Sequence, residues 1–247
     1  MNSLILCEGK TDCVLLQYYL EKVHLWRYDK GRHGIKLEPD CWSVCLAKNG
    51  HTLNIAETKG CSRLVEGLIT AIVGSENAAP ERPEEFWDKI IIFTDNDEEN
   101  TCENMINDIN GRLSETSASF EKIIQKGIWN EGVLQSVEGV KSFKFLLMFI
   151  PFDENGALET YLLNCIGNDD SYDKSIIDKG NIFVDTIDPE ARYLTQRRLK
   201  TKAKFDVYFS IRTSAEQYAQ RQHILKSVAW ENYDTIRNDF EIFADLG

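Results

Sequence analysis

Residues 89–97 read KIIIFTDND, and this stretch decides the fold. Its centre, Ile90 to Phe93, is apolar at every position, without the alternation expected of a strand that has one face in water. Such a run is typical of a central parallel strand that is buried on both faces. The run ends in Asp95 and Asp97, so two carboxylates are expected where this strand leaves the sheet.

Shorter apolar runs on both sides of this strand extend the sheet. The further predicted strands are residues 4–7, 42–46 and 143–150. Helical spacing of apolar residues predicts helices over residues 12–23, 61–73 and 98–113. Because strands alternate with helices, we predict a parallel, Rossmann-like α/β sheet with right-handed crossovers and flanking helices. Residues 115–142 are less regular and fit an insertion.

After Pro151 the pattern becomes mainly helical. The predicted helices are residues 157–166, about 189–202, 214–228 and 235–245, and residues 168–171 read as a loop. We therefore expect two parts. Residues 1–155 would form the α/β domain, and residues 156–247 would form a helical part packed on or beside it.

Acidic loops follow two of the predicted strands. Glu8 and Gly9 come directly after residues 4–7, and Asp95 and Asp97 come after the central strand. Ligands bind at the carboxyl edge of open α/β sheets. Clustered carboxylates are costly unless a cation lies between them, and hard divalent cations prefer such oxygen ligands. Taken singly, each loop is equally well explained by turn residues or helix caps.

The combination of residues 4–12, LILCEGKTD, with residues 90–97, IIIFTDND, resembles the Toprim domain. This domain is shared by type IA and type II topoisomerases, bacterial primases, overcoming-lysogenization-defect nucleases and small ribosomal-RNA maturation nucleases. The glutamate loop is most similar to that of the maturation nucleases. The resemblance covers about residues 1–155, and residues 151–159 look like a segment of an uncharacterised prokaryotic Toprim-like family.

The resemblance implies that Glu8, Asp95 and Asp97 bind Mg²⁺ or Mn²⁺ and are the catalytic residues. No topoisomerase tyrosine and no primase zinc domain can be identified, which leaves a nuclease that hydrolyses phosphodiester bonds in DNA or RNA. Antiphage relatives of the family imply a role in phage defence, with an ATPase partner or as a homodimer. The alternative is a non-catalytic Toprim-like module that binds nucleic acid or a partner protein.

Further residues are candidates for the same site. Glu159 would complete a second metal position, or would be a helical glutamate in water. The candidates for substrate phosphate are Lys10, Lys200, Lys202 and Lys204, and those for indirect support of the metal are Asp12 and Glu99. Residues 49–52, with His51, are expected near the same edge, as a plain turn or as a phosphate contact.

Composition limits the class of protein. The chain has 247 residues, of which 43% are hydrophobic and 28% charged, so it contains enough apolar side chains for a sizeable core. The formal net charge of −12 argues against a protein that coats nucleic acid. One segment, residues 190–204, is basic, however, with six lysines and arginines against one glutamate. An otherwise acidic chain can therefore still contact phosphates locally.

The seven cysteines lack the spacing of a zinc finger, and we interpret them as reduced thiols. No apolar stretch is long enough for a membrane helix and no signal peptide is apparent, so a cytoplasmic protein without membrane contact is expected.

Three other families fit less well. A haloacid-dehalogenase-like phosphatase expects Thr or Val where Glu99 stands, and a glycosyltransferase with Asp-x-Asp leaves Glu8 unexplained. A phosphate-binding loop would need a glycine five positions before Gly9.

Overall fold

The computed structural model describes residues 1–32, 34–35, 37, 40–78, 86–213 and 221–247. Its strands are β1 (Asn2–Cys7), β2 (Arg27–Tyr28), β3 (Ser43–Lys48), β4 (His51–Glu57), β5 (Lys89–Asp95), β6 (Ser119–Phe120), β7 (Trp129–Ser136) and β8 (Gly139–Ile150). They form one sheet in the order β2-β3-β4-β1-β5-β8-β7-β6. The four central strands β4, β1, β5 and β8 are parallel, and β3 and β7 beside them run antiparallel.

The predicted α/β class is therefore confirmed, although the sheet is mixed and only its centre is parallel. The strand of residues 89–94 lies in that centre, between β1 and β8. Ile90, Ile91, Ile92 and Phe93 are at most 1% exposed. Side chains of successive residues point to opposite faces of a sheet, so a strand covered on both faces needs apolar residues at every position.

The second predicted strand, residues 42–46, does not lie in the parallel centre of the sheet. The predicted strand 42–46 corresponds to β3, which pairs antiparallel with the unpredicted strand β4. Asn49 and Gly50 form the hairpin turn, with φ of 50° and 81°, the left-handed pair that two-residue hairpins require. Because β4 runs parallel to β1 with Thr52 opposite Asn2, this turn lies at the amino edge of the central strands. The expectation that residues 49–52 and His51 approach the carboxyl edge was wrong.

The segment 115–142, expected to be an irregular insertion, instead completes one side of the sheet. β7 alternates buried and more exposed residues and forms a hairpin with the first part of β8. β8 itself begins at Gly139, four residues before the predicted strand. Its outer part pairs only with β7, whereas its inner part lies between β7 and β5.

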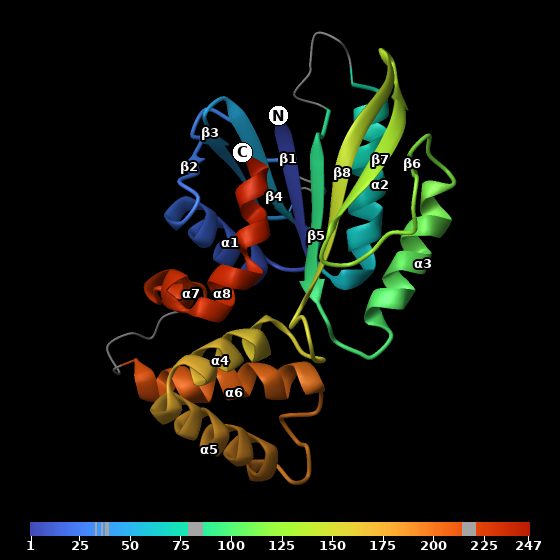
Figure 1. The fold of residues 1–247 in the computed structure, drawn as a ribbon. Coiled ribbons are helices and arrows are strands. Elements are labelled where there is room, and N and C mark those ends of the chain that lie inside the picture. The colour runs from blue at the N-terminus through green and yellow to red at the C-terminus, as the bar shows by residue number, and fades with distance from the viewer. Residues whose placement is uncertain (33, 36, 38–39, 79–85, 214–220) are drawn as a thin grey trace.

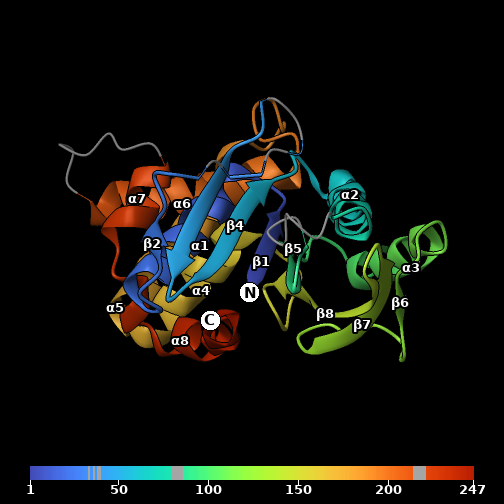
Figure 2. The same ribbon diagram turned by 90° about the horizontal axis from the view of Figure 1, so that it is seen from above.

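Helices cover both faces of the sheet (Figures 1 and 2). The first three helices are α1 (Lys10–Lys22), α2 (Leu64–Glu76, after a 3₁₀ turn at Cys61–Arg63) and α3 (Thr101–Leu113), close to their predicted ranges. α2 and α3 pack on one face against Leu4, Ile90 and Phe145. α1 covers the other face and packs against Ile5, Ile91 and Leu146.

The last third of the chain first leaves the sheet and then returns to it. α4 (Leu158–Asp169), α5 (Ser171–Ile187) and α6 (Arg197–Arg212) lie beyond the carboxyl ends of the central strands, and we call these three helices the cap (Figure 1). α7 (Arg221–Ser227), α8 (Asp234–Asp239) and a terminal 3₁₀ segment (Glu241–Leu246) then run back beside α1. Their buried residues Leu225, Phe240 and Phe243 share one core with α1 and β1.

Two helix predictions in this region need correction. α5 was not predicted, and α6 begins at Arg197 rather than near Pro189. The predicted loop at 168–171 is much shorter than expected, because α4 continues to Asp169 and α5 begins at Ser171. Only Asp170 separates the two helices, and it caps α5 by accepting N–H bonds from Tyr172 and Asp173. Of the predicted helix 214–228, residues 214–220 lie outside the described residues. Among the described helices, none combines the length and the apolar character that crossing a membrane requires.

Candidate metal centre

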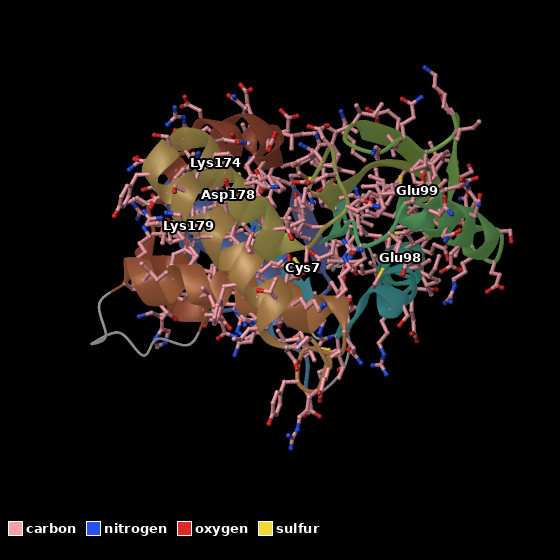
Figure 3. The ribbon with its side chains drawn as sticks, turned by 90° about the horizontal axis from the view of Figure 1, so that it is seen from below. Cys7, Glu98, Glu99, Lys174, Asp178 and Lys179 are labelled. Atoms are coloured by element: carbon pink, nitrogen blue, oxygen red, sulfur yellow. The ribbon has the colours of Figure 1, made fainter. Side chains whose placement is uncertain are left out.

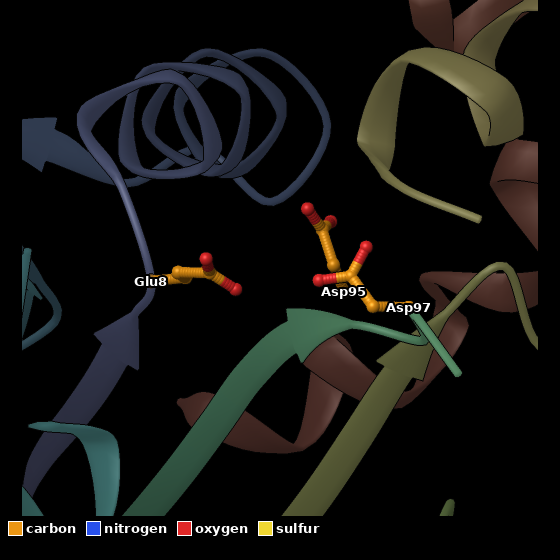
Figure 4. A group of neighbouring side chains, drawn as sticks. All are labelled: Glu8, Asp95 and Asp97. Atoms are coloured by element: carbon orange, nitrogen blue, oxygen red, sulfur yellow. The ribbon is translucent and has the colours of Figure 1, made fainter. Parts of the chain in front are cut away.

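Three carboxylates meet at the carboxyl edge of the sheet. Glu8 follows β1, Asp95 is the last residue of β5, and Asp97 lies two residues later. One oxygen from each lies within 4.8 Å of the others, and the three carboxylates point toward one another (Figure 4). The predicted convergence is therefore present. It arises because β1 and β5 are parallel neighbours, with Cys7 opposite Phe93, so both strands end at the same level.

Hydrogen bonds from neighbouring loops fix two of these acids. The hydroxyl of Thr94 donates to Glu8 Oε2 at 3.3 Å, and the backbone N–H of Gly60 donates to the Glu8 carbonyl at 2.9 Å. Asp95 Oδ1 accepts the backbone N–H of Leu158, the first residue of α4, at 2.9 Å. The site therefore joins β1, β5, the loop before α2, and the cap.

Asn96, between the two aspartates, organises the loop that leads to the cap. Its side-chain amide donates to the carbonyls of Pro151 and Glu154, at 3.3 and 2.9 Å. Its backbone N–H donates to Ile150, and its carbonyl accepts from Gly156. These four bonds hold the chain of residues 150–156 against the Asp-x-Asp loop, so that α4 begins directly beside Asp95.

The site concentrates negative charge around the buried Asp12 and the half-buried Glu8 and Asp95, whereas Asp97 is exposed. Burial, and then the charges of Asp12, Glu8 and Asp97, raise the pKa of Asp95 to about 9. Burial is also the main cause that raises the pKa of Asp12 to about 7. The pKa of Glu8 is raised by burial and by the charge of Asp97. A bound divalent cation would favour the ionised carboxylates and reverse these shifts.

Asp12, predicted to support the metal, and Glu159, predicted to complete a second metal position, both lie beside this cluster. Asp12 is 7% exposed, belongs to the first turn of α1, and accepts the N–H of Gly9 at 2.8 Å. Glu159 is 6% exposed in the first turn of α4, and its Oε1 lies 3.7 Å from Arg221. Glu159 is thus close to the cluster but paired with a protein cation, and its oxygens are not among the three that converge.

A cavity of about 500 Å³ opens over the carboxylates. Its lining includes the starts of α1, α4 and α6, at Gly9, Ala157 and Gln196. Helix N-termini present unpaired N–H groups and a partial positive charge, which attract anions. α6 also supplies Arg197, Arg198, Thr201 and Lys202 to the wall. The positive charge of Arg197 acts on Asp97, and that of Arg198 on both Glu8 and Asp97.

The remaining predicted residues lie farther out. Of the three lysines predicted on the basic segment, Lys202 lines this cavity, whereas Lys200 and Lys204 line a second cavity on another side of α6. Lys204 also pairs with Asp185 at 2.8 Å. Lys10 is exposed at the start of α1 and does not line the cavity. Glu98 lines the cavity, but Glu99 does not, and both lie on the loop after β5 at one side of the cap (Figure 3).

The sequence pattern did not identify three candidate functional residues, Arg197, Arg198 and Arg221. The first two were counted in the basic segment but were expected inside a helix that begins near Pro189. Because α6 begins at Arg197, both arginines occupy its first turn and face the site. Arg221 donates to both carboxylate oxygens of Asp206, at 3.1 and 2.7 Å, and lies beside Glu159. Only the tertiary fold brings Arg221 to these partners.

Comparisons with known proteins give a family and a similar fold. No curated protein matches the sequence. The crystal structure of the hypothetical protein PH0156 from Pyrococcus horikoshii OT3 is similar, with a TM-score of 0.51 at 18% identity, over 99% of this chain and 98% of that one. At this identity the likeness concerns the fold alone. A family model described as "Protein of unknown function (DUF3226)" matches residues 2–243. The chain therefore belongs to the DUF3226 family.

Proposed function

We propose that the chain is a nuclease of Toprim type that hydrolyses phosphodiester bonds in DNA or RNA with Mg²⁺ or Mn²⁺. The observation that carries the proposal is the convergence of Glu8, Asp95 and Asp97 in a cavity that Arg197 and Arg198 also line. Metal-assisted phosphodiester hydrolysis needs acids that can hold a metal ion and cations that can bind the phosphate. This cavity supplies both.

The donor set supports a hard divalent cation. All three groups offer carboxylate oxygens, the ligands that Mg²⁺ and Mn²⁺ prefer. Two oxygens on opposite sides of a Mg²⁺ ion lie about 4.2 Å apart, as twice the metal–oxygen distance. The oxygens here lie within 4.8 Å, so small side-chain rotations would bring them to ligand distance. Glu8, Asp95 and Asp97 would hold the metal, and Glu159 would add an oxygen if it released Arg221.

The residues around the metal position would orient the substrate. A bound cation would lower the pKa of water and neutralise phosphate charge. Arg197 and Arg198 would bind the non-bridging oxygens of the scissile phosphate, with Lys202 behind them on α6. The starts of α1 and α6 line the same cavity.

The second candidate is a non-catalytic module that binds nucleic acid or a partner protein. The raised pKa values of Asp95 and Asp12 favour it, because protonation would relieve the charge cluster without a metal. The two readings differ in what Asp95→Asn does. The amide mimics the protonated acid, so it would preserve a module and destroy a metal-dependent enzyme.

Cleavage assays test the proposal directly. Plasmid DNA, single-stranded DNA and total RNA would be incubated with Mg²⁺, Mn²⁺ or EDTA. We expect cleavage with either metal, none in EDTA, and none with Glu8→Gln or Asp95→Asn. Asp108→Asn is the matched control, because Asp108 is an exposed acid on α3 that pairs with Arg112 at 3.0 Å. Cleavage that survives in both site variants, or Mn²⁺ binding that does, would refute the proposal. A role in phage defence, with an ATPase partner or as a homodimer, stays a prediction from the Toprim resemblance.

A further inference from the structure

We propose that a track for single-stranded nucleic acid runs from the carboxylates across the first turn of α6 into the second cavity, with Tyr193 as a platform on which an unpaired base stacks. The inference rests on the proposed function, since it assigns the substrate class of that site. It concerns different residues, however, and its test separates the two.

Two adjoining cavities define the track. The second cavity has a volume of about 540 Å³ and lies between α4, α5, α6 and the loop that joins α5 to α6. It shares Gln196, Arg197 and Thr201 with the cavity over the carboxylates. The two hollows therefore meet at the start of α6. A phosphodiester chain whose scissile phosphate lies at the carboxylates would continue past Arg197 into the second hollow.

Positive charge follows the same line. Arg197 lines both cavities, Arg198 and Lys202 line the first, and Lys200 and Lys204 line the second, where Lys204 is paired with Asp185. The whole chain carries a net charge of −12, so most of its surface repels a polyanion. The cations along the two adjoining cavities would therefore attract a phosphate backbone that the rest of the protein surface repels.

The loop of residues 188–196 lines part of the second cavity and contains Tyr193, which lies next to the lining residues in the sequence without being one of them. Asp188 accepts the backbone N–H groups of Arg192, Tyr193 and Leu194, at 3.0, 2.8 and 2.8 Å. These bonds lower the pKa of Asp188, so the acid stays ionised and the loop stays fixed near neutral pH. Ala191 and Leu194 line the cavity on both sides of Tyr193 in the sequence.

Tyr193 itself is free to receive a base. Its side chain is 71% exposed, and the Arg192 guanidinium lies 5.3 Å from its ring centre. With most of its surface in water, the ring adds little to the apolar core. An exposed aromatic ring with a neighbouring arginine, beside a cationic groove, is the arrangement by which single-strand-binding proteins hold bases.

The size of the hollows selects a single strand. Each cavity has the volume of a small-molecule pocket, enough for roughly one or two nucleotides. Both the carboxylates and the first turn of α6 line the first cavity. A base inside a duplex is already stacked on both faces, so Tyr193 can contact only an unpaired or terminal base.

Binding measurements on the full chain test the track. Fluorescence anisotropy would follow a labelled oligothymidylate of about 12 nucleotides in Ca²⁺ buffer. We expect Tyr193→Ala to weaken binding at least about fivefold, the lower end of the loss for one stacked base. The control is Tyr172→Ala. Tyr172 is 75% exposed and lies in the first turn of α5, roughly 20 Å along the helix from its last residues. Thermal melting would confirm that both variants fold.

Two further measurements sharpen the test. Arg197→Gln should weaken binding and reduce the slope of log K against log salt by about 0.7, the value for one lost phosphate contact on a single strand. A hairpin duplex of the same length should bind at least tenfold more weakly than the single strand. Equal affinities for the parent, Tyr193→Ala and Tyr172→Ala, or tighter binding of the duplex, would overturn the track.

Hydrolysis of a small diester, bis(4-nitrophenyl) phosphate, separates the track from the proposed function. This substrate needs the carboxylates but is too short to reach Tyr193. If the track is correct, Tyr193→Ala keeps the parent's rate on the small diester and loses cleavage of the oligonucleotide. If the diester is not hydrolysed while binding still depends on Tyr193, the nuclease proposal fails and the track stands.

Discussion

Asp95 Oδ1 accepts the backbone N–H of Leu158 at 2.9 Å, so the carboxylate that ends β5 also caps the start of α4. The candidate metal ligand is therefore also a structural contact between the sheet and the cap. The two roles can be separated by substitution. Asparagine removes the charge but keeps an oxygen that can accept the Leu158 N–H, whereas alanine removes both.

We expect Asp95→Asn to be more stable than Asp95→Ala by about 0.5–2 kcal/mol, the range for losing a helix-capping side chain. Both variants lose the ionised carboxylate, so the difference between them isolates the cap. Urea unfolding in EDTA would measure it. Equal unfolding midpoints and slopes for the two variants would show that α4 does not need this hydrogen bond.

The pKa shifts of Asp95 and Asp12 predict how the stability of the metal-free protein depends on pH. Their folded pKa values are about 9 and about 7, above the ordinary value of 3.8. As the pH rises above 4, the unfolded chain releases these protons first, so the folded state is progressively disfavoured until the pH passes the folded values. Stability in EDTA should therefore fall between pH 5 and 8.5, by at most about 1.4 kcal/mol per pH unit for each group.

Melting temperatures in EDTA across this range would test the sign. Asp95→Asn cannot ionise at this position, so its curve should be flatter than that of the parent, and the variant should be the more stable of the two above pH 7. Asp108→Asn should follow the parent. A parent curve that rises with pH, or one parallel to that of Asp95→Asn, would contradict the shifts.

Metal binding should have the opposite effect. A ligand present at a hundred times its Kd stabilises the folded state by about 2.7 kcal/mol. For a chain of this length this corresponds to an increase in Tm of roughly 5–10 °C. We expect Mn²⁺ to raise Tm by this amount at pH 8 and by less at pH 6, where protons compete for the carboxylates. Calorimetry with Glu8→Gln should show little of the increase, and an equal increase in that variant would remove Glu8 from the ligand set.

The residues that set the centre of the sheet could be predicted because their signals are local. The continuous apolar run at 90–93 identifies β5 without any knowledge of its neighbours. Parallel strands that end at one edge then bring Glu8 to Asp95 and Asp97. Strand β4 escaped prediction because it buries polar side chains. Asn54 is 9% exposed and accepts the N–H of Ile35 at 3.1 Å, a contact that exists only in the folded chain.

The cap was harder to predict for a related reason. α5 leaves Ile182, Phe183 and Ile187 exposed, so its apolar residues do not form the single buried stripe by which helices are found. The start of α6 was misplaced because Asp188 binds three backbone N–H groups of the following residues and holds them in a loop. The sequence there contains a helix-compatible pattern, and one carboxylate overrides it.

Arg221 links α7 to both α4 and α6, through Glu159 and Asp206. Its side chain is 24% exposed and that of Glu159 is 8% exposed. Arg221→Leu would leave the Glu159 carboxylate buried beside Asp95 and Asp12 without a cation. We expect a loss of about 1–3 kcal/mol, less than for a fully buried pair because solvent reaches the arginine.

A double-mutant cycle would isolate this pair. Adding Glu159→Gln to Arg221→Leu removes the unpaired charge, so the double variant should be more stable than Arg221→Leu alone. Urea unfolding in EDTA would measure all four proteins. Strictly additive losses would show that Arg221 acts through Asp206 and not through Glu159.

Phe240 connects the returning C-terminal segment to the sheet. It is fully buried, and its ring centre lies 5.0 Å from Tyr19 on α1, 6.0 Å from Phe93 on β5, and 6.0 Å from Tyr161 on α4. One ring thus contacts three elements that surround the site. Phe240→Ala would open a cavity among them, and such truncations cost about 3–5 kcal/mol. Phe183→Ala is the control, because Phe183 is 50% exposed and its loss should change stability by less than about 0.5 kcal/mol.

Chemical denaturation would compare the variants, and hydrogen exchange would locate the effect. If Phe240 holds the C-terminal segment to the sheet, amide protection should fall in α1, β5 and α4 together. Loss of protection confined to residues 234–247 would show that the segment docks without supporting the sheet.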